Sequence, residues 1–249
     1  MVSISIIKVR ATYFFIYIDE RNKSGINMEG KNCIALVSGG IDSPVAVARM
    51  LRLGWKMKTI HCSQDPITGP EPELKTVRCI QALRKLDGEI GEFARNNIDD
   101  EMIVVPVAEA LSKFTEKWCH SEYFIHMKRL FNAIADVASE SYESTHVLTG
   151  ENLGQVSSQT LGNLGAVEET TSLIPLRPLL GLDKTVITRM ARNLGTFEIS
   201  SGPEVCDALG PSMPTTVANK EWLEKSENRL GGLRNLAIEA WAKRRIVSL

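Results

Sequence analysis

The chain has 249 residues, of which 43% are hydrophobic and 24% charged, and its formal net charge is −1. This length allows one large α/β domain or a domain with an appendage, and the composition is that of an ordinary globular protein. The near-neutral charge excludes a uniformly basic nucleic-acid binder, so any RNA contact must come from a local patch or from another subunit. No apolar run approaches the about 20 residues of a membrane span, and the N-terminus lacks the pattern of a secretory signal.

The cysteines favour a reducing compartment. They are five in number, with no C-x-x-C pair: Cys33, Cys62, Cys79, Cys119 and Cys206. An odd number at this spacing is typical of free thiols rather than of a disulfide framework or a structural zinc site. We therefore expect a cytoplasmic protein.

The N-terminal residues 3–18 are rich in β-branched and aromatic types and predict one long strand or a hairpin. The polar stretch 19–30 then reads as a linker, and Met28 is an alternative start just before the next strand. We expect three parts: a β-rich extension with a linker (1–30), a main domain (31–217) and a helical extension (218–249).

From Asn32 onward strands and helices alternate, which favours a parallel sheet. We predict strands at 33–37, 57–62, 102–107, 146–149 and 172–175, and helices at 43–53, 72–86, 123–140 and 184–194. Residues 196–216 are expected to form a long irregular loop. Residues 221–245 predict an amphipathic helix with a break at Gly231 and Gly232.

The hexapeptide SGGIDS (38–43) lies between a buried strand and a helix start. Gly39 and Gly40 let the backbone approach a ligand and adopt positive φ at little cost. The free N–H groups of the helix start favour an anion, Ser38 and Ser43 add hydroxyl donors, and Asp42 is suited to hold Mg²⁺. This pattern predicts a phosphate site.

The alternative is a serine-capped turn that happens to contain glycines. The Walker pattern is absent, because no Gly-Lys-Ser/Thr follows the loop. However, SGGIDS after a buried strand resembles the PP-loop of the ATP pyrophosphatases, in which the loop grips pyrophosphate and the enzyme transfers AMP to its substrate.

Two later segments are candidates for the same site. TGENLGQVSSQTL (149–161) directly follows a predicted strand, at the edge where open α/β sheets bind ligands, although a plain polar loop explains its composition equally well. In LRPLLGLDK (176–184), Asp183 is a good helix N-cap. Arg177 and Lys184 are candidates for phosphate or RNA contacts, or for a helix-start charge and a surface salt bridge.

Together the motifs resemble the catalytic domain of the tRNA 4-thiouridine synthetases, sulfurtransferases also linked to thiamine biosynthesis. SGGIDSPVA, TGENLGQVSSQTL, RPLLGLDK and GTFEIS occur in the family's order and approximate spacing, from about Cys33 to Thr216. The resemblance implies an α/β fold with an open doubly wound parallel sheet of about five strands, and ATP and Mg²⁺ as cofactors.

The resemblance also implies which residues meet the nucleotide. Those lining the adenine pocket are Leu36, Val37, His61 and Cys62; those at the phosphates are Ser38, Gly39, Gly40, Asp42 and Ser43; further contacts are Gly150, Gln159 and Lys128. Lys128 stands where many members have the first of two arginines. Lysine keeps the charge but loses the planar fork, so Arg129 is an alternative.

Asp42 and Cys206 are the predicted catalytic residues. The family places a cysteine at the position of Cys206 that helps to pass sulfur, and its thiolate would be the nucleophile; the alternative is a small buried hydrophobe. His61 is assigned no acid–base role. Cys33, Cys62 and Cys79 are expected to be packing residues, and Cys119 is undecided.

The match also has gaps, and they affect the expected partners. About thirty residues precede the first catalytic strand, too few for the family's ferredoxin-like and THUMP domains, and nothing after Leu249 matches a rhodanese domain. The family's cluster-binding C-x-x-C is replaced by residues 124–127. We therefore expect tRNA to be presented by a separate THUMP-type protein, with a sulfur donor protein or sulfide, and allow for a homodimer.

The function implied is ATP-dependent tRNA sulfurtransfer, in which a uridine is adenylated and its oxygen replaced by sulfur, with release of AMP and pyrophosphate. One alternative is an adenylating enzyme that acts on a small molecule of thiamine or other sulfur metabolism. Another is a nucleotide-binding module without catalysis.

Overall fold

The computed structural model describes residues 2–9, 12–19, 31–154, 156–202 and 208–249. The strands are β1 (Val2–Val9), β2 (Thr12–Asp19), β3 (Asn32–Leu36), β4 (Lys56–Ser63), β5 (Glu101–Pro106), β6 (His146–Leu148), β7 (Ile174–Arg177) and β8 (Arg245–Ser248). The α-helices are α1 (Asp42–Leu51), α2 (Glu71–Lys85), α3 (Glu89–Asn97), α4 (Ala108–Lys113), α5 (Tyr123–Tyr142), α6 (Leu161–Glu168), α7 (Lys184–Asn193), α8 (Phe197–Ser200), α9 (Lys220–Arg229) and α10 (Leu233–Ala242). Two 3₁₀ turns are η1 (His120–Glu122) and η2 (Ser157–Gln159).

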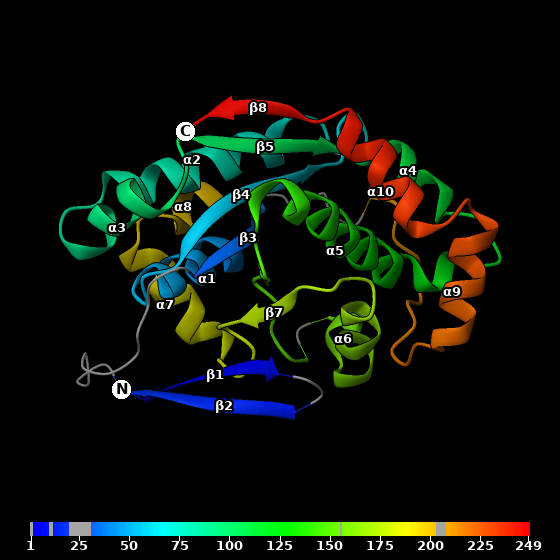
Figure 1. Ribbon diagram of the computed structural model, residues 1–249, viewed down its shortest axis with the longest axis horizontal. Coiled ribbons are helices and arrows are strands. Elements are labelled where there is room, and N and C mark those ends of the chain that lie inside the picture. Colours follow the sequence, from blue (N-terminus) through cyan, green and yellow to red (C-terminus); the bar gives the residue numbers. More distant parts are fainter. Residues whose placement is uncertain (1, 10–11, 20–30, 155, 203–207) are drawn as a thin grey trace.

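All eight strands form one sheet in the order β2-β1-β7-β6-β3-β4-β5-β8 (Figure 1). The five central strands, from β7 to β5, are parallel, so the expected parallel sheet is confirmed. The sequence of the N-terminal segment predicts one long strand or a hairpin, and the segment forms the hairpin, of β1 and β2. Strand β1 also pairs antiparallel with β7. At the opposite edge β8 pairs antiparallel with β5.

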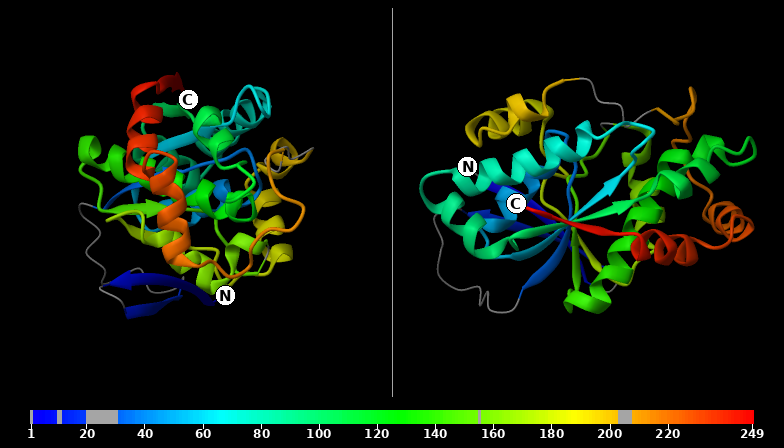
Figure 2. Two further views of the ribbon diagram at one scale, coloured as in Figure 1. Left: turned by 90° about the vertical axis from the view of Figure 1, so that its right-hand side faces the viewer. Right: turned by 90° about the horizontal axis from the view of Figure 1, so that it is seen from above.

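Helices cover both faces of the sheet (Figure 2). One hydrophobic cluster joins α1, α2, α3 and α7 to the sheet, and a second joins α4, α5 and α10 to its other face. Within β3, Cys33 and Ala35 belong to the first cluster and Ile34 to the second, and all three are almost fully buried. A strand with both faces covered reads as a continuous apolar run, which is why this strand is visible in the sequence.

The strand order reverses beside β3. From β3 the chain proceeds through β4 and β5 on one side, then returns to build β6 and β7 on the other. In open α/β sheets the crevice at the carboxyl ends of the strands flanking such a switch point is the ligand site. The loops at this point are those after β3 and β6, which contain SGGIDS and TGE.

Several elements were not predicted. Helix α3 has only nine residues, and its apolar stripe of Ile90, Phe93 and Ala94 spans little more than one turn, whereas α4, α6 and α8 are shorter still. The C-terminal helix breaks at Gly231 and Gly232 as expected, but the last residues form β8, whose strand character depends on pairing with β5.

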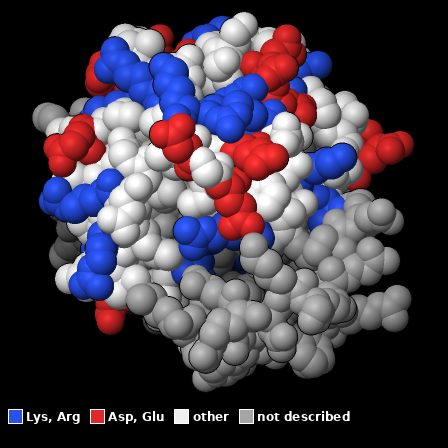
Figure 3. Space-filling view, turned by 90° about the vertical axis from the view of Figure 1, so that its left-hand side faces the viewer, with Lys and Arg blue, Asp and Glu red and all other residues white. Residues whose placement is uncertain are grey.

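No helix in the described part of the chain is long and apolar enough to cross a membrane. Figure 3 shows the end of the molecule that carries α3, where basic and acidic side chains are interspersed over the described surface, in keeping with a net charge of −1.

Candidate nucleotide site

A cavity of about 350 Å³ lies at the switch point of the sheet. Its walls come from the carboxyl ends of β3, β4 and β6, the first turn of α1, and parts of α2 and α5. Every nucleotide-binding residue expected from the sequence lines it: Leu36, Val37, Ser38, Gly39, Gly40, Asp42, Ser43, His61, Cys62, Lys128, Gly150 and Gln159. Segments more than one hundred residues apart are thus brought together.

The SGGIDS loop is closed by its two serines. Ser43 Oγ accepts a hydrogen bond from Ser38 N (2.9 Å) and donates one to Ser38 O (3.0 Å). Gly40 N lies 3.3 Å from Ser38 Oγ. The expectation that the glycines adopt positive φ is wrong, because neither occurs among the positive-φ glycines of the described residues. Gly39 is required for a different reason: a Cβ there would lie 2.8 Å from the carbonyl oxygen of Pro72.

The loop after β6 is pressed against the start of α1. A Cβ on Gly150 would lie 2.8 Å from Ser43 N and 3.0 Å from the carbonyl carbon of Asp42, both backbone atoms that cannot turn aside. Glycine is therefore the residue that allows the TGE loop and the SGGIDS loop to form one wall.

Asp42 opens α1 and forms an ion pair with Lys184, whose Nζ lies 2.6 Å from Asp42 Oδ1. Lys184 is the first residue of α7, and Asp183 occupies the N-cap position as predicted, although its side chain makes no capping hydrogen bond. The RPLLGLDK segment therefore meets the SGGIDS loop through this lysine.

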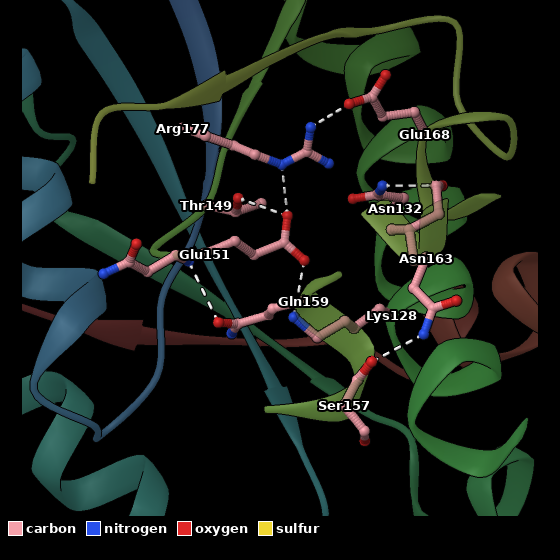
Figure 4. A network of polar contacts seen from close by, with 11 residues as sticks. Lys128, Asn132, Thr149, Glu151, Ser157, Gln159, Asn163, Glu168 and Arg177 are labelled. Atoms are coloured by element: carbon pink, nitrogen blue, oxygen red, sulfur yellow. Dashed lines mark hydrogen bonds and ion pairs between the residues drawn. The ribbon is translucent and has the colours of Figure 1, made fainter. Parts of the chain in front are cut away.

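A network of buried charges supports the cavity wall (Figure 4). Glu151 accepts hydrogen bonds from Lys128 Nζ (2.7 Å), Arg177 Nε (2.6 Å) and Thr149 Oγ1 (3.1 Å), and Arg177 also pairs with Glu168. Burial alone would raise the pKa of the Glu151 carboxyl, but the charges of Lys128 and Arg177 outweigh it and hold that pKa well below its usual range. Arg177 is thus a buried structural cation rather than a surface charge.

Lys128 and Arg129 have different surroundings. Lys128 lines the cavity, whereas Arg129 is buried, binds Glu227 of α9 through Nε (2.6 Å) and Nη2 (2.9 Å), and also donates to Ala166 O. His126 Nδ1 lies 3.0 Å from the same Glu227 carboxylate. Arg129 is committed to holding α9 against α5, so the geometry leaves Lys128 as the cavity cation of the pair.

Gln159 faces the cavity from η2, and its Oε1 accepts a hydrogen bond from Asn152 N (3.3 Å). Asn152 Nδ2 in turn donates to Leu182 O (2.5 Å). These two contacts connect the GQVSSQ stretch, the TGE loop and the RPLLGLDK segment behind the cavity wall.

His61 is nearly fully buried at the end of β4, with Nδ1 3.0 Å from Val37 O and 3.2 Å from Thr76 Oγ1. Burial lowers the pKa of its imidazole, so the ring is neutral at physiological pH. A neutral ring that is hydrogen-bonded to the backbone supports the view that His61 shapes the pocket and takes no part in proton transfer.

The described cysteines are free thiols. Cys33, Cys79 and Cys119 are buried, and burial raises the pKa of each, that of Cys119 to about 11. Half-buried Cys62 lines the cavity, and its pKa is likewise raised by burial. Cys206 lies outside the described residues. The described residues hold no group of three or more His, Cys, Asp and Glu side chains arranged to bind a metal ion.

Sequence reasoning missed several cavity residues. Gln64, Lys75 and Asn132 line the cavity from β4's end, α2 and α5. None of the three lies in a recognisable motif, and helix periodicity hints at the direction of Lys75 and Asn132 only, since Gln64 follows a strand. Glu151 stood inside a recognised motif, but its partner Lys128 is 23 residues away in the chain.

Comparisons with known proteins agree with this geometry. The model of the family described as "Thiamine biosynthesis protein (ThiI)" matches residues 28–231. A probable tRNA sulfurtransferase of Bacillus licheniformis is 31% identical over 225 residues, covering 89% of this chain and 53% of the relative. One of Staphylococcus saprophyticus is 34% identical over 227 residues, with the same coverage of both. The chain thus spans about half the length of the curated relatives it matches.

A solved structure, described as a 4-thiouridine synthetase–RNA complex with bound ATP, superposes with a TM-score of 0.79 at 31% identity. The match covers 88% of this chain and 55% of that one. The residues that the ThiI family model matches include every residue that lines the cavity, as well as the RPLLGLDK segment. Because the family model matches 204 residues, and because those residues build the site, the chain belongs to the ThiI family.

Proposed function

We propose that this chain is the catalytic part of an ATP-dependent tRNA sulfurtransferase, which adenylates a tRNA uridine and replaces its oxygen with sulfur to form 4-thiouridine. The observation that carries the proposal is that all the expected nucleotide-binding residues line one cavity, at the switch point of the sheet. The names of the similar proteins support it: tRNA sulfurtransferases in sequence, and a 4-thiouridine synthetase with RNA and ATP in structure.

The cavity suits ATP from end to end. At the ends of β3 and β4, the cavity wall offers adenine a largely apolar surface formed by Leu36, Val37, His61 and Cys62. The amides of the first turn of α1 and the serine hydroxyls favour the phosphates, because a helix N-terminus carries partial positive charge. Lys128 adds a cation to the cavity wall from α5.

The residues present also fit Mg²⁺. Mg²⁺ is usually held by one or two carboxylates together with substrate phosphates and water. Asp42 supplies such a carboxylate at the cavity wall, partly exposed and paired with a lysine that is itself half exposed, so the pair opens without breaking a buried contact. When bound, the ion neutralises phosphate charge, and Asp42 would hold it there.

The chemistry has two steps. A uridine carbonyl oxygen forms a bond to the α-phosphorus of ATP while the bond to the pyrophosphate oxygen breaks, which yields an adenylated uridine and pyrophosphate. Sulfur then bonds to the uridine carbon, and AMP leaves with the original oxygen. The chain contributes positioning and charge neutralisation in both steps. Free sulfide can bond to the uridine carbon directly. With a persulfide donor, we assign to the Cys206 thiolate the release of the sulfur: it bonds to the donor's inner sulfur, the S–S bond breaks, and the outer sulfur leaves as the sulfide that attacks the uridine. An external dithiol then reduces the disulfide left between Cys206 and the donor.

The partners in this proposal are tRNA, a separate THUMP-type protein that presents it, and a donor protein or sulfide that supplies the sulfur. The place of action is the cytoplasm, where thiols stay reduced.

The test incubates the purified protein with radiolabelled ATP, Mg²⁺, sulfide and fractionated cellular RNA, and follows AMP, pyrophosphate and thionucleosides together. We expect 4-thiouridine to appear with AMP, pyrophosphate release to depend on RNA, and Asp42→Ala to abolish both. Cys206→Ser should stop thiolation with a protein persulfide donor and leave ATP binding intact. Pyrophosphate release that depends on a metabolite instead of RNA would assign the small-molecule alternative. Turnover unchanged in Asp42→Ala and in Cys206→Ser would reduce the chain to a binding module.

A further inference from the structure

The cations around the cavity differ in how they are neutralised. Lys128 is paired with Glu151, and Lys184 is paired with Asp42. Lys75 also lines the cavity, from the second turn of α2, and is half-buried. Within the described residues its ammonium group has no carboxylate within ion-pair distance and no hydrogen bond. Lys75 is therefore the cavity cation whose charge the described residues leave uncompensated.

The side chain of Lys75 runs along the SGGIDS loop. A Cβ built on Gly39 would lie 2.8 Å from Lys75 Cβ and 3.5 Å from its Cδ, so the lysine stem packs directly on the first glycine of the loop. Beyond it, Nζ lies 3.1 Å from the position that a Cβ on Gly202 would take. The ammonium group thus stands between the SGGIDS loop and the chain that leaves α8.

Helix α2 holds this lysine in a fixed place. One residue on, Thr76 Oγ1 donates to Pro72 O (2.8 Å) and lies 3.2 Å from His61 Nδ1, which joins the first turn of α2 to β4. One turn further, Cys79 Sγ lies 3.4 Å from Ser200 Oγ and packs α2 on α8. These buried contacts of Thr76 and Cys79 fix the part of α2 that follows Lys75 against β4 and α8.

We propose that Lys75 binds the β and γ phosphates of ATP and keeps hold of the pyrophosphate that leaves. This rests on the proposed function, which it extends to a phosphate contact that no motif indicates. The α1 amides and Lys75 approach the SGGIDS turn from different elements, so they grip an anion that rests on it from two directions. An ammonium group that no carboxylate of the described residues neutralises gives its full charge to that anion, and it favours the step in which the bridging oxygen gains negative charge.

The experiment measures binding by titration calorimetry in Mg²⁺, with AMP, α,β-methylene-ATP and inorganic pyrophosphate as probes. We expect Lys75→Met to lower the affinity for the ATP analogue and for pyrophosphate about ten- to a hundredfold, the range for a charge-assisted hydrogen bond. The affinity for AMP should change by less than about twofold. Lys75→Arg, which keeps the charge, should recover most of the loss. Lys85→Met is the matched control, since Lys85 is exposed in the last turn of the same helix.

The outcomes separate the two proposals. Equal affinities of wild type and Lys75→Met for the ATP analogue would overturn the role of Lys75 and leave the proposed function standing. Equal weakening of AMP and of the ATP analogue would also overturn it, because a distorted pocket and not a lost phosphate contact would be the cause. If circular dichroism shows that Lys75→Met does not fold, the affinities of Lys75→Arg and wild type for the ATP analogue are compared instead. Because Lys75→Arg keeps the charge, loss of analogue binding in this variant would contradict the proposal. A wild type that binds neither nucleotide would refute the proposed function itself, and the role of Lys75 with it.

Discussion

Replacing Glu151 with glutamine should destabilise the fold by about 3 kcal/mol. Glu151 accepts three hydrogen bonds and neutralises two cations, Lys128 and Arg177, at a position that is 7% exposed. Breaking a buried ion pair by removing one partner costs about 3–5 kcal/mol, because a buried charge loses its compensation. We expect the lower end of this range, since Arg177 keeps Glu168 and the glutamine oxygen still accepts one hydrogen bond.

The effect should depend on pH in a defined direction. The folded protein holds the pKa of Glu151 below its value in the unfolded chain, about 4.3 for an ordinary glutamate. The stabilisation by this carboxylate is therefore fully present above that pH and is lost as the pH falls below it toward the folded pKa. The difference in stability between wild type and Glu151→Gln should shrink between about pH 5 and pH 3.

Urea unfolding followed by circular dichroism measures both effects. Glu169→Gln is the matched control, because Glu169 lies next to Glu168 but pairs with Lys220 on the surface, where an ion pair is worth at most about 1 kcal/mol. A loss below about 1 kcal/mol for Glu151→Gln at pH 7, or a difference from wild type that grows as the pH falls, would refute the account of this network.

Three further predictions follow from single contacts. Gly150→Ala should abolish nucleotide binding and cost about 1–3 kcal/mol, because its methyl group collides with backbone, whereas Gly181→Ala, which has open space around its Cβ, should leave calorimetric binding unchanged. Arg129→Met should lower the free energy of unfolding in urea by about 3–5 kcal/mol, since it leaves the buried Glu227 with one partner fewer; a change within about 1 kcal/mol would contradict the pairing. Cys119, buried with its pKa raised by burial to about 11, should resist iodoacetamide at pH 8 until the protein unfolds, as mass spectrometry would reveal, and rapid labelling of the native protein would show the thiol to be accessible.

The parts of the fold that depend on near neighbours were predictable. A central strand buried on both faces is a continuous apolar run, and the glycine turn and helix that follow it are set by a few adjacent residues, so β3, the SGGIDS loop and α1 are all readable from the chain. Short helices such as the nine-residue α3 carry a weaker local signal, because their apolar stripe spans little more than one turn.

Local sequence also misassigned the reason for one feature. The sequence predicts that Gly39 allows a close approach to a ligand and a positive φ; its φ is not positive, and its missing Cβ lets α2 approach the loop. A Cβ at position 39 would collide with the carbonyl oxygen of Pro72, which belongs to α2. Because α2 packs on the loop only in the folded protein, residues near Gly39 in the sequence do not indicate this constraint.

The sequence alone determines which residues could bind a nucleotide, because each motif, such as SGGIDS or RPLLGLDK, is a continuous stretch of the chain. Which charges neutralise one another is settled by folding, since Arg129 and Glu227 are 98 residues apart and Arg177 and Glu151 are 26 apart. Burial then converts such distant pairs into strong interactions, because a carboxylate out of water needs a cation beside it. The roles of Lys128, Arg129 and Arg177 therefore differ by their surroundings, although in sequence each is simply a basic residue in or beside a motif.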